Sequence, residues 1–222
     1  MNGRRVLISC GPMRTSVDSV RFLQNRSSGW VGLTLADELT KRGAQVTVLL
    51  GPVEKAMAER FSKFRLFRYE GVNEYRRYIE RLFPESDVFL SVAAVLDFEV
   101  IPYDGKIERE KLQDLNELSF RIRAVPDFVA WAAQHKKENQ KVIAFAAEKG
   151  TQNEILQRAR KKMEKKGVDA MVANPVWQGL GPESESNLLW ILRPGLPDVE
   201  IPLAPKTEQA APLVDLLFSN WT

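Results

Sequence analysis

The sequence has 222 residues, of which 44% are hydrophobic and 27% charged, and its formal net charge is +3. These values are typical of a globular protein with one substantial core, and the charge is too small to predict a nucleic-acid partner. No apolar run approaches the ~20 residues of a membrane-spanning helix, and the amino terminus has no signal-peptide pattern, so we expect a cytoplasmic protein.

Apolar runs alternate with segments of helical periodicity along the chain. The first run, Val6–Ser9, predicts a buried strand, and Val31, Leu35 and Leu39 predict a helix that ends near Gly43. The elements expected next are a strand at Gln45–Leu50, a strand at Lys63–Tyr69, a helix at Glu74–Phe83, a strand at Asp87–Val95, a helix at Pro126–Lys137, a strand at Val142–Ala147, a helix at Glu154–Lys166 and a strand at Ala170–Ala173.

The end of the chain has a different pattern. Leu188–Leu192 and Val199–Leu203 flank a turn rich in proline and glycine and predict a hairpin, and Thr207–Phe218 predicts a final helix. The whole order predicts an α/β fold: a Rossmann-like, doubly wound, mostly parallel sheet with helices on both faces and a carboxyl-terminal β-hairpin added to it. We expect a single domain over residues 1–222.

Two predicted loops, Gly11–Ser28 and Phe98–Asn116, are much longer than the about two to six residues usual between strand and helix. Both follow the carboxyl ends of strands, where open α/β sheets bind their ligands. The glycine fingerprint G-x-G-x-x-G and the P-loop motif are absent, so neither a generic dinucleotide site nor a P-loop is supported.

The first long loop ends in Asn25-Arg26-Ser27-Ser28-Gly29, just before a predicted helix. Ser27 or Ser28 is suited to cap that helix. Capping alone does not require Asn25 or so long a loop. We therefore favour a functional interpretation, in which the free N–H groups of the helix face an anion.

Cys10 is the only cysteine and His135 the only histidine. A single cysteine excludes an internal disulfide and a cysteine-cluster metal site. His135 lies in a polar stretch and is expected on a solvated helix face. These facts disfavour Ser-His-Asp hydrolases and most zinc enzymes.

The first strand and the loop after it contain V-L-I-S-C-G-P at residues 6–12, then Arg14, Asp18, Val20-Arg21-Phe22 and N-R-S-S-G at residues 25–29. This stretch resembles the opening of phosphopantothenate–cysteine ligases, which typically reads V-L-I-T-A-G-P-T-R-E-P-I-D-P-V-R-F-I-S-N-R-S-S-G. The resemblance continues in the same order over most of the chain, at Ala93–Phe98, Lys106-Ile107, Pro126-Asp127, Phe145–Glu148, Lys162–Asp169 and Val172–Asn174. Each motif is weak alone, but their order and spacing make the match specific.

The resemblance implies a reaction in two halves, as in the stand-alone bacterial type of this ligase. The carboxylate of 4′-phosphopantothenate attacks the α-phosphate of a nucleotide, CTP in the bacterial branch, with Mg²⁺. The amine of cysteine then attacks the acyl-nucleotide, in the pathway to coenzyme A. The resemblance also implies a homodimer, and because it begins at the start of the chain we expect the decarboxylase of the pathway to be a separate protein.

The resemblance assigns roles to eleven residues. Asn25 matches the asparagine that holds the acyl-nucleotide intermediate, and Lys106 matches the lysine of a flap that contacts the phosphates. The residues that match nucleotide-contacting positions are Ala93, Ala94, Asp97, Pro126, Asp127, Phe128, Phe145, Lys162 and Lys166. Metal ligands are not predicted.

Several positions depart from the family pattern. A second flap lysine is replaced by Glu108, although Arg109 follows it, the asparagine before Pro126 is Val125, and the lysine after the S-S-G motif is Trp30. These departures leave the choice between CTP and ATP open. They also motivate an alternative, a non-catalytic descendant that binds nucleotide or phosphopantothenate. An NAD(P)-dependent Rossmann oxidoreductase is a further alternative, which the missing glycine fingerprint disfavours.

Overall fold

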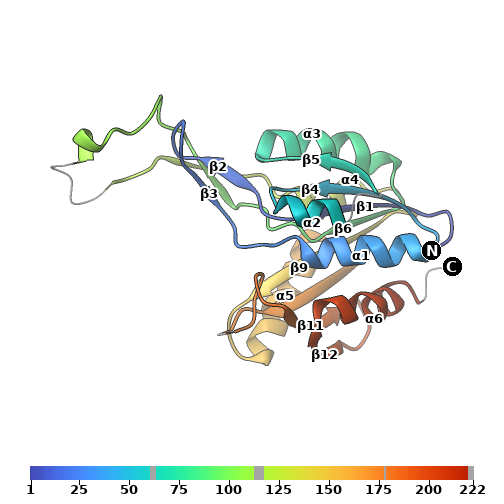
Figure 1. Cartoon of the computed structure of the whole chain (residues 1–222). Coiled ribbons are helices and arrows are strands. Elements are labelled where there is room, and N and C mark those ends of the chain that lie inside the picture. Colours follow the sequence, from blue (N-terminus) through green and yellow to red (C-terminus); the bar gives the residue numbers. More distant parts are fainter. Residues whose placement is uncertain (61–63, 113–117, 178, 220–222) are drawn as a thin grey trace.

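The computed structural model describes residues 1–60, 64–112, 118–177 and 179–219, and its centre is an eight-stranded sheet (Figure 1). In spatial order the strands are β12 (Val199–Pro205), β11 (Ser186–Leu192), β10 (Ala170–Pro175), β9 (Lys141–Glu148), β6 (Val88–Ser91), β1 (Arg5–Cys10), β4 (Gln45–Leu50) and β5 (Arg65–Arg68). Neighbours from β10 to β5 pair in parallel, whereas β11 and β12 are antiparallel. The predicted sheet and its added hairpin are confirmed.

Helices cover both faces of the sheet, as predicted. The core on one face lies under α1 (Trp30–Lys41) and α6 (Lys206–Phe218). The core on the other lies under α3 (Val72–Leu82), α4 (Phe128–His135) and α5 (Gln152–Lys166). Strand β1 contributes side chains to both cores, because Val6 and Ile8 face the first core and Leu7 faces the second.

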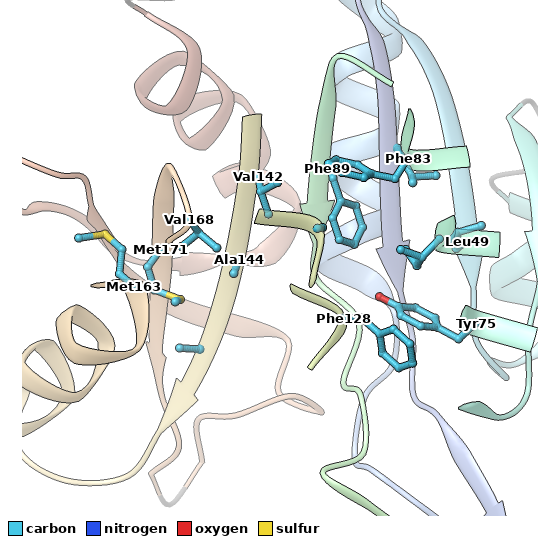
Figure 2. Close-up of a cluster of buried hydrophobic side chains, with 14 of the residues drawn as sticks. Leu49, Tyr75, Phe83, Phe89, Phe128, Val142, Ala144, Met163, Val168 and Met171 are labelled. Atoms are coloured by element: carbon cyan, nitrogen blue, oxygen red, sulfur yellow. The ribbon is translucent and has the colours of Figure 1, made fainter. Parts of the chain in front are cut away.

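Aromatic side chains pack closely in the second core (Figure 2). The ring of Tyr75 on α3 lies 5.1 Å from that of Phe128, the first residue of α4, and its hydroxyl donates to Ser9 Oγ at 3.0 Å. Phe83 lies next to Phe89 of β6, with ring centroids 6.0 Å apart. These contacts fix the start of α4 against the sheet.

The two long loops form an arm that projects from the body of the protein (Figure 1). We use "the arm" for residues 14–24 and the described part of 98–124. Its elements are the ribbon of β2 (Arg14–Ser16) and β3 (Phe22–Gln24), the ribbon of β7 (Phe98–Val100) and β8 (Ile122–Ala124), and the short 3₁₀ helix η2 (Arg109–Leu112). The sequence pattern predicted loops here, not strands.

The arm is held together by buried polar groups as well as by a small apolar cluster. Val100 N donates to Thr15 Oγ1 at 2.9 Å, joining the two ribbons. Val17, Val100 and Ile107 pack together beside this bond. The carboxylate of Asp18 accepts from Ile107 N at 3.1 Å, so the β2–β3 turn also fixes the backbone next to Lys106.

Other predicted elements differ in detail. Strand β6 ends at Ser91 rather than Val95, because the chain turns and Ala94 N donates to Gly11 O at 3.0 Å, beside the end of β1. Helix α2 (Lys55–Arg60) and the 3₁₀ turn η1 (Phe83–Glu85) were not predicted, and the predicted strand residue Lys63 lies outside the described residues. Within the described ranges no helix is long and apolar enough to cross a membrane.

Candidate functional site

A cavity of about 480 Å³ opens where β6, β9 and β10 end. Ten of the eleven site residues predicted from the sequence line it: Asn25, Ala93, Ala94, Asp97, Pro126, Asp127, Phe128, Phe145, Lys162 and Lys166. Carboxyl ends of parallel strands meet at one edge of a sheet, and this is why segments far apart in the sequence converge there. The divergent residues Trp30 and Val125 line the same cavity.

The amino terminus of α1 forms one wall of the cavity. Its N-cap residue is Gly29, in the left-handed region at φ 77°, rather than Ser27 or Ser28 as expected. Ser28 Oγ still accepts weakly from Trp30 N at 3.4 Å. The first turn of α1 carries no acidic residue, so its free N–H groups and the positive end of the helix dipole are available to an anion.

Asn25 joins two loops at the edge of the cavity. Its Nδ2 donates to the carbonyl oxygens of Ala94 and Val95, at 3.0 Å each. Both amide hydrogens are therefore used within the protein, and Oδ1 is what the side chain offers to a ligand. The small side chains of Ala93 and Ala94 leave the backbone of this loop open to close approach.

The start of α4 and the end of α5 form the opposite wall. Asp127 caps α4 by accepting from Ala130 N at 3.0 Å, and its other oxygen accepts from Lys166 Nζ. Burial alone would raise the pKa of Asp127, but the bonds from Lys166 and the backbone outweigh it and lower that pKa below its ordinary value. Phe128, a residue that is 5% exposed, lines the cavity, and its ring packs on that of Tyr75.

Lys162 lies one turn before Lys166, on the same face of α5 as predicted. Its ammonium lies 2.6 Å from Glu148 Oε1, and Arg158 Nε donates to the other oxygen of Glu148 at 3.0 Å. Both predicted nucleotide-contacting lysines are therefore paired with carboxylates in this structure. Asp97 differs, because its exposed carboxylate has no partner among the described side chains.

Lys106 does not line this cavity. It lies on the arm, where its half-exposed ammonium pairs with Glu108 Oε2 at 3.2 Å. The replacement of a flap lysine by glutamate thus brings a carboxylate to the remaining lysine. The role of Lys106 stays a prediction.

Sequence analysis assigned no role to five further residues that line the cavity: Asn174, Gly181, Pro182, Asn187 and Lys206. Asn174 belongs to the family motif matched at Val172–Asn174, so a signal existed for it. Lys206 had none, because a lysine at the start of a helix usually faces solvent. In the structure it is 4% exposed.

The cavity offers little for covalent catalysis. Cys10 is buried, and burial raises its pKa to about 12, so the thiol is protonated at neutral pH. His135 lies on the exposed end of α4, with Nδ1 2.8 Å from Trp131 O. Within the part of the chain that the structure describes, no three His, Cys, Asp or Glu residues gather as a metal site. The arrangement is suited to binding and orienting anionic substrates.

Comparisons with known proteins identify relatives in sequence and in fold. A protein of unknown prokaryotic origin named Cysteine/Cysteine sulfinic acid decarboxylase is 33% identical over 96% of this chain and 58% of its own length. The Coenzyme A biosynthesis bifunctional protein CoaBC of Bacillus subtilis is 30% identical over 94% of this chain and 49% of its own length. The chain thus spans about half the length of these relatives.

A solved structure, the C-terminal domain of a Coenzyme A biosynthesis bifunctional protein CoaBC, aligns with 99% of this chain and 98% of its own, with 25% identity and a TM-score of 0.76. Residues 1–220 match the family described as DNA/pantothenate metabolism flavoprotein C-terminal domain. The chain therefore belongs to this family, which confirms the resemblance to phosphopantothenate–cysteine ligases drawn from its motifs.

Proposed function

We propose that the chain is a phosphopantothenate–cysteine ligase of coenzyme A biosynthesis. The observation that supports this most is the convergence of ten predicted site residues, from five separate segments of the chain, on one cavity. Membership of the family adds to it. A separate decarboxylase that acts on the product stays a prediction.

The nucleotide lies across the cavity in this proposal. Its base and ribose occupy the wall at Pro126–Phe128, near Phe145, where Asp127 and Lys166 offer an acceptor and a donor. Its phosphates extend to the amino terminus of α1, where free backbone N–H groups can bind an anion without a positively charged side chain. We expect CTP, with ATP as the alternative.

The reaction proceeds through an acyl-nucleotide. A carboxylate oxygen of phosphopantothenate bonds to the α-phosphorus while the bond to pyrophosphate breaks. The amine of cysteine then bonds to the acyl carbon, the nucleoside monophosphate leaves with the carboxylate oxygen, and the amine loses a proton. Both nucleophiles belong to substrates, which agrees with the protonated thiol of Cys10. The chain's contribution is positioning and charge stabilisation.

Asn25 has a defined part in this scheme. Because its Nδ2 donates to the carbonyl oxygens of Ala94 and Val95, its Oδ1 is the atom that remains to bind a ligand, as an acceptor. An acceptor there suits an N–H or O–H group of the intermediate or the entering amine of cysteine. Loss of the side chain also releases the Ala94–Val95 loop.

Magnesium would enter with the nucleotide. Mg²⁺ usually keeps several waters and is held by phosphates and one or two carboxylates. Asp97 is the cavity carboxylate without a partner among described side chains, and its oxygens suit a bound Mg²⁺ or its waters. The ion would neutralise charge on the phosphates.

The proposal includes a homodimer, and the position of Lys106 on the arm is interpreted through it. Nine large apolar side chains on the arm are exposed: Val20, Phe22, Leu23, Phe98, Ile101, Tyr103, Leu118, Phe120 and Ile122. Such a surface is favourable to cover, and a second copy of the chain would cover it. Lys106, which lies on the arm and outside its own cavity, would then act near the cavity of the other subunit.

Release of pyrophosphate tests the function. Purified protein is mixed with Mg²⁺, phosphopantothenate and either CTP or ATP, with and without cysteine. We expect release that requires phosphopantothenate, with one nucleotide preferred, and amide formation once cysteine is added. Nucleotide binding without release would favour the non-catalytic descendant, for which the Lys106–Glu108 pair is the motivating observation. An Asn25→Ala variant as active as the parent would overturn the role given to Asn25.

A further inference from the structure

Lys206 is a buried cation in the wall of the candidate site. Its side chain lines the cavity, and the residue is 4% exposed. Its ammonium donates to Gly181 O at 3.2 Å and to Pro182 O at 2.9 Å. Within the described ranges no carboxylate pairs with it, in contrast to Lys162 and Lys166.

A charge in this setting is costly. Carbonyl dipoles satisfy two of the three N–H donors of an ammonium but carry no negative charge. A buried cation without a counter-charge is destabilising. In agreement, burial lowers the pKa of Lys206 below its ordinary value. A structural lysine with so little compensation is unusual, whereas an anionic ligand in the cavity would supply the missing charge.

The place of Lys206 in the fold indicates which part of a ligand it would meet. Arg42, the C-cap residue of α1, pairs with Asp215 in the second half of α6 and donates to Ala211 O at 3.2 Å. The two helices therefore run in the same direction, and both begin at the cavity, where Trp30 and Lys206 line it. Lys206 thus lies on the α1 side of the site, away from Asp127 and Lys166 of the opposite wall.

We propose that Lys206 binds the pyrophosphate end of the nucleotide and acts with the amino terminus of α1 as the anion-binding wall of the cavity. This rests on the proposed function, in which the base lies at the opposite wall. The terminal phosphates carry the largest negative charge of the substrates. A lysine there would bind a nucleoside triphosphate more tightly than the corresponding monophosphate.

The test compares the affinities of the triphosphate and the monophosphate. Binding of CTP and CMP, each with Mg²⁺, is measured by calorimetry for the parent, Lys206→Met and Lys206→Arg. The control is Lys161→Met, which removes the same charge from an exposed position of α5 outside the cavity. Charge-assisted hydrogen bonds contribute about 1.5–3 kcal/mol. We therefore expect Lys206→Met to weaken the binding of CTP by about tenfold or more and to change the binding of CMP little.

The outcomes separate this inference from the proposed function. Failure of the parent to bind CTP, and ATP measured in its place, would contradict the proposed function itself. The inference would be contradicted if the parent and a folded Lys206→Met bound CTP equally well. It would also be contradicted if the substitution weakened the binding of CTP and CMP equally, and Lys206 would then only hold the Gly181–Pro182 loop in place. If Lys206→Met does not fold, Lys206→Arg decides. A folded arginine variant that keeps the preference for CTP supports the inference, and one that loses it overturns it.

Discussion

At the scale of residues, the charges of the candidate site fall into two groups. Lys162 and Lys166 have carboxylate partners, whereas the partners of Lys206 among the described residues are carbonyl oxygens. A paired lysine binds an added anion less strongly, because its own carboxylate competes. The paired lysines therefore suit the base and ribose end of a nucleotide, and Lys206 suits the phosphates.

The pair of Lys106 and Glu108 leads to a prediction about activity. Glu108→Gln removes the competing carboxylate, and exposed ion pairs contribute at most about 1 kcal/mol, so we expect the pyrophosphate-release rate at low nucleotide concentration to rise about two- to fivefold. Glu110→Gln, which removes a nearby charge from η2, is the control. Steady-state kinetics measure both, and identical rates for the two variants would show that Glu108 does not restrain Lys106.

At the scale of elements, the position of α1 depends on a close contact with β1. A Cβ built on Gly32 would lie 2.2 Å from Cys10 Cβ, so glycine is what lets the helix approach the end of the strand. This contact brings the amino terminus of α1 to the cavity. The helix propensity of glycine is poor, and close packing explains its presence better than local preference does.

Gly32→Ala should therefore destabilise the protein. Overpacking of a core costs about 1–3 kcal/mol. Replacing glycine by alanine in a helix gains about 1 kcal/mol, which is less than most of that range. Denaturant titration would measure a lower free energy of unfolding. Gly71→Ala is the control, since the nearest atom to a Cβ there is Arg14 O at 3.6 Å. Equal stability of the two variants would mean that α1 shifts without cost.

The arm gives a prediction about pH. Burial would raise the pKa of Asp18, but the N–H groups of Val20, Ile107 and Arg21 and the charge of Arg21 lower it to about 2. A group whose pKa is lower in the folded state stabilises the fold above its ordinary pKa, 3.8 for this carboxyl, and loses that effect as pH falls toward 2.

We therefore expect the free energy of unfolding of the parent to exceed that of Asp18→Asn by a margin that is largest above pH 4. The margin should shrink as the pH falls from 4 to about 2, within the range that denaturant titrations can cover. A margin independent of pH would show that the pKa of Asp18 is the same in the folded and unfolded protein, and would contradict this prediction.

The sequence predicted the body of the protein better than the arm. Strand β4 consists mostly of apolar residues with a high strand propensity, and its predicted bounds match the structure. The arm strands are three residues long and keep exposed apolar side chains such as Phe22 and Ile122. They therefore lack the alternation of apolar and polar residues that would have predicted strands. Their pairing depends on tertiary contacts, among them the bond between Val100 and Thr15.

Many residues of the candidate site could also be predicted from the sequence, because the family motifs that contain them occur in the expected order. The exception is Lys206, whose burial depends on the Gly181–Pro182 loop folding over it. A contact between a loop and the start of a later helix leaves no periodic pattern. The position of Lys106 outside its own cavity likewise depends on the tertiary path of the arm.

At the scale of the whole molecule, the exposed apolar side chains of the arm predict self-association. Ile122→Asp should yield a monomer in sedimentation, because it places a charge within a surface that we expect a second copy to bury. Leu203→Asp is a matched control, since Leu203 lies off the arm and is 58% exposed, as is Ile122. A monomeric parent, or a dimer unaffected by Ile122→Asp, would contradict this role of the arm.

The mechanism itself makes the most direct prediction. Phosphopantothenate labelled with ¹⁸O in its carboxylate is converted with cysteine and the preferred nucleotide, and the products are examined by mass spectrometry. Attack of the carboxylate on the α-phosphorus transfers one labelled oxygen to the nucleoside monophosphate. We expect that label in the monophosphate and none in pyrophosphate. Label in inorganic phosphate with release of a nucleoside diphosphate, or amide formation with no label in the nucleoside monophosphate, would contradict ligation through an acyl-nucleotide.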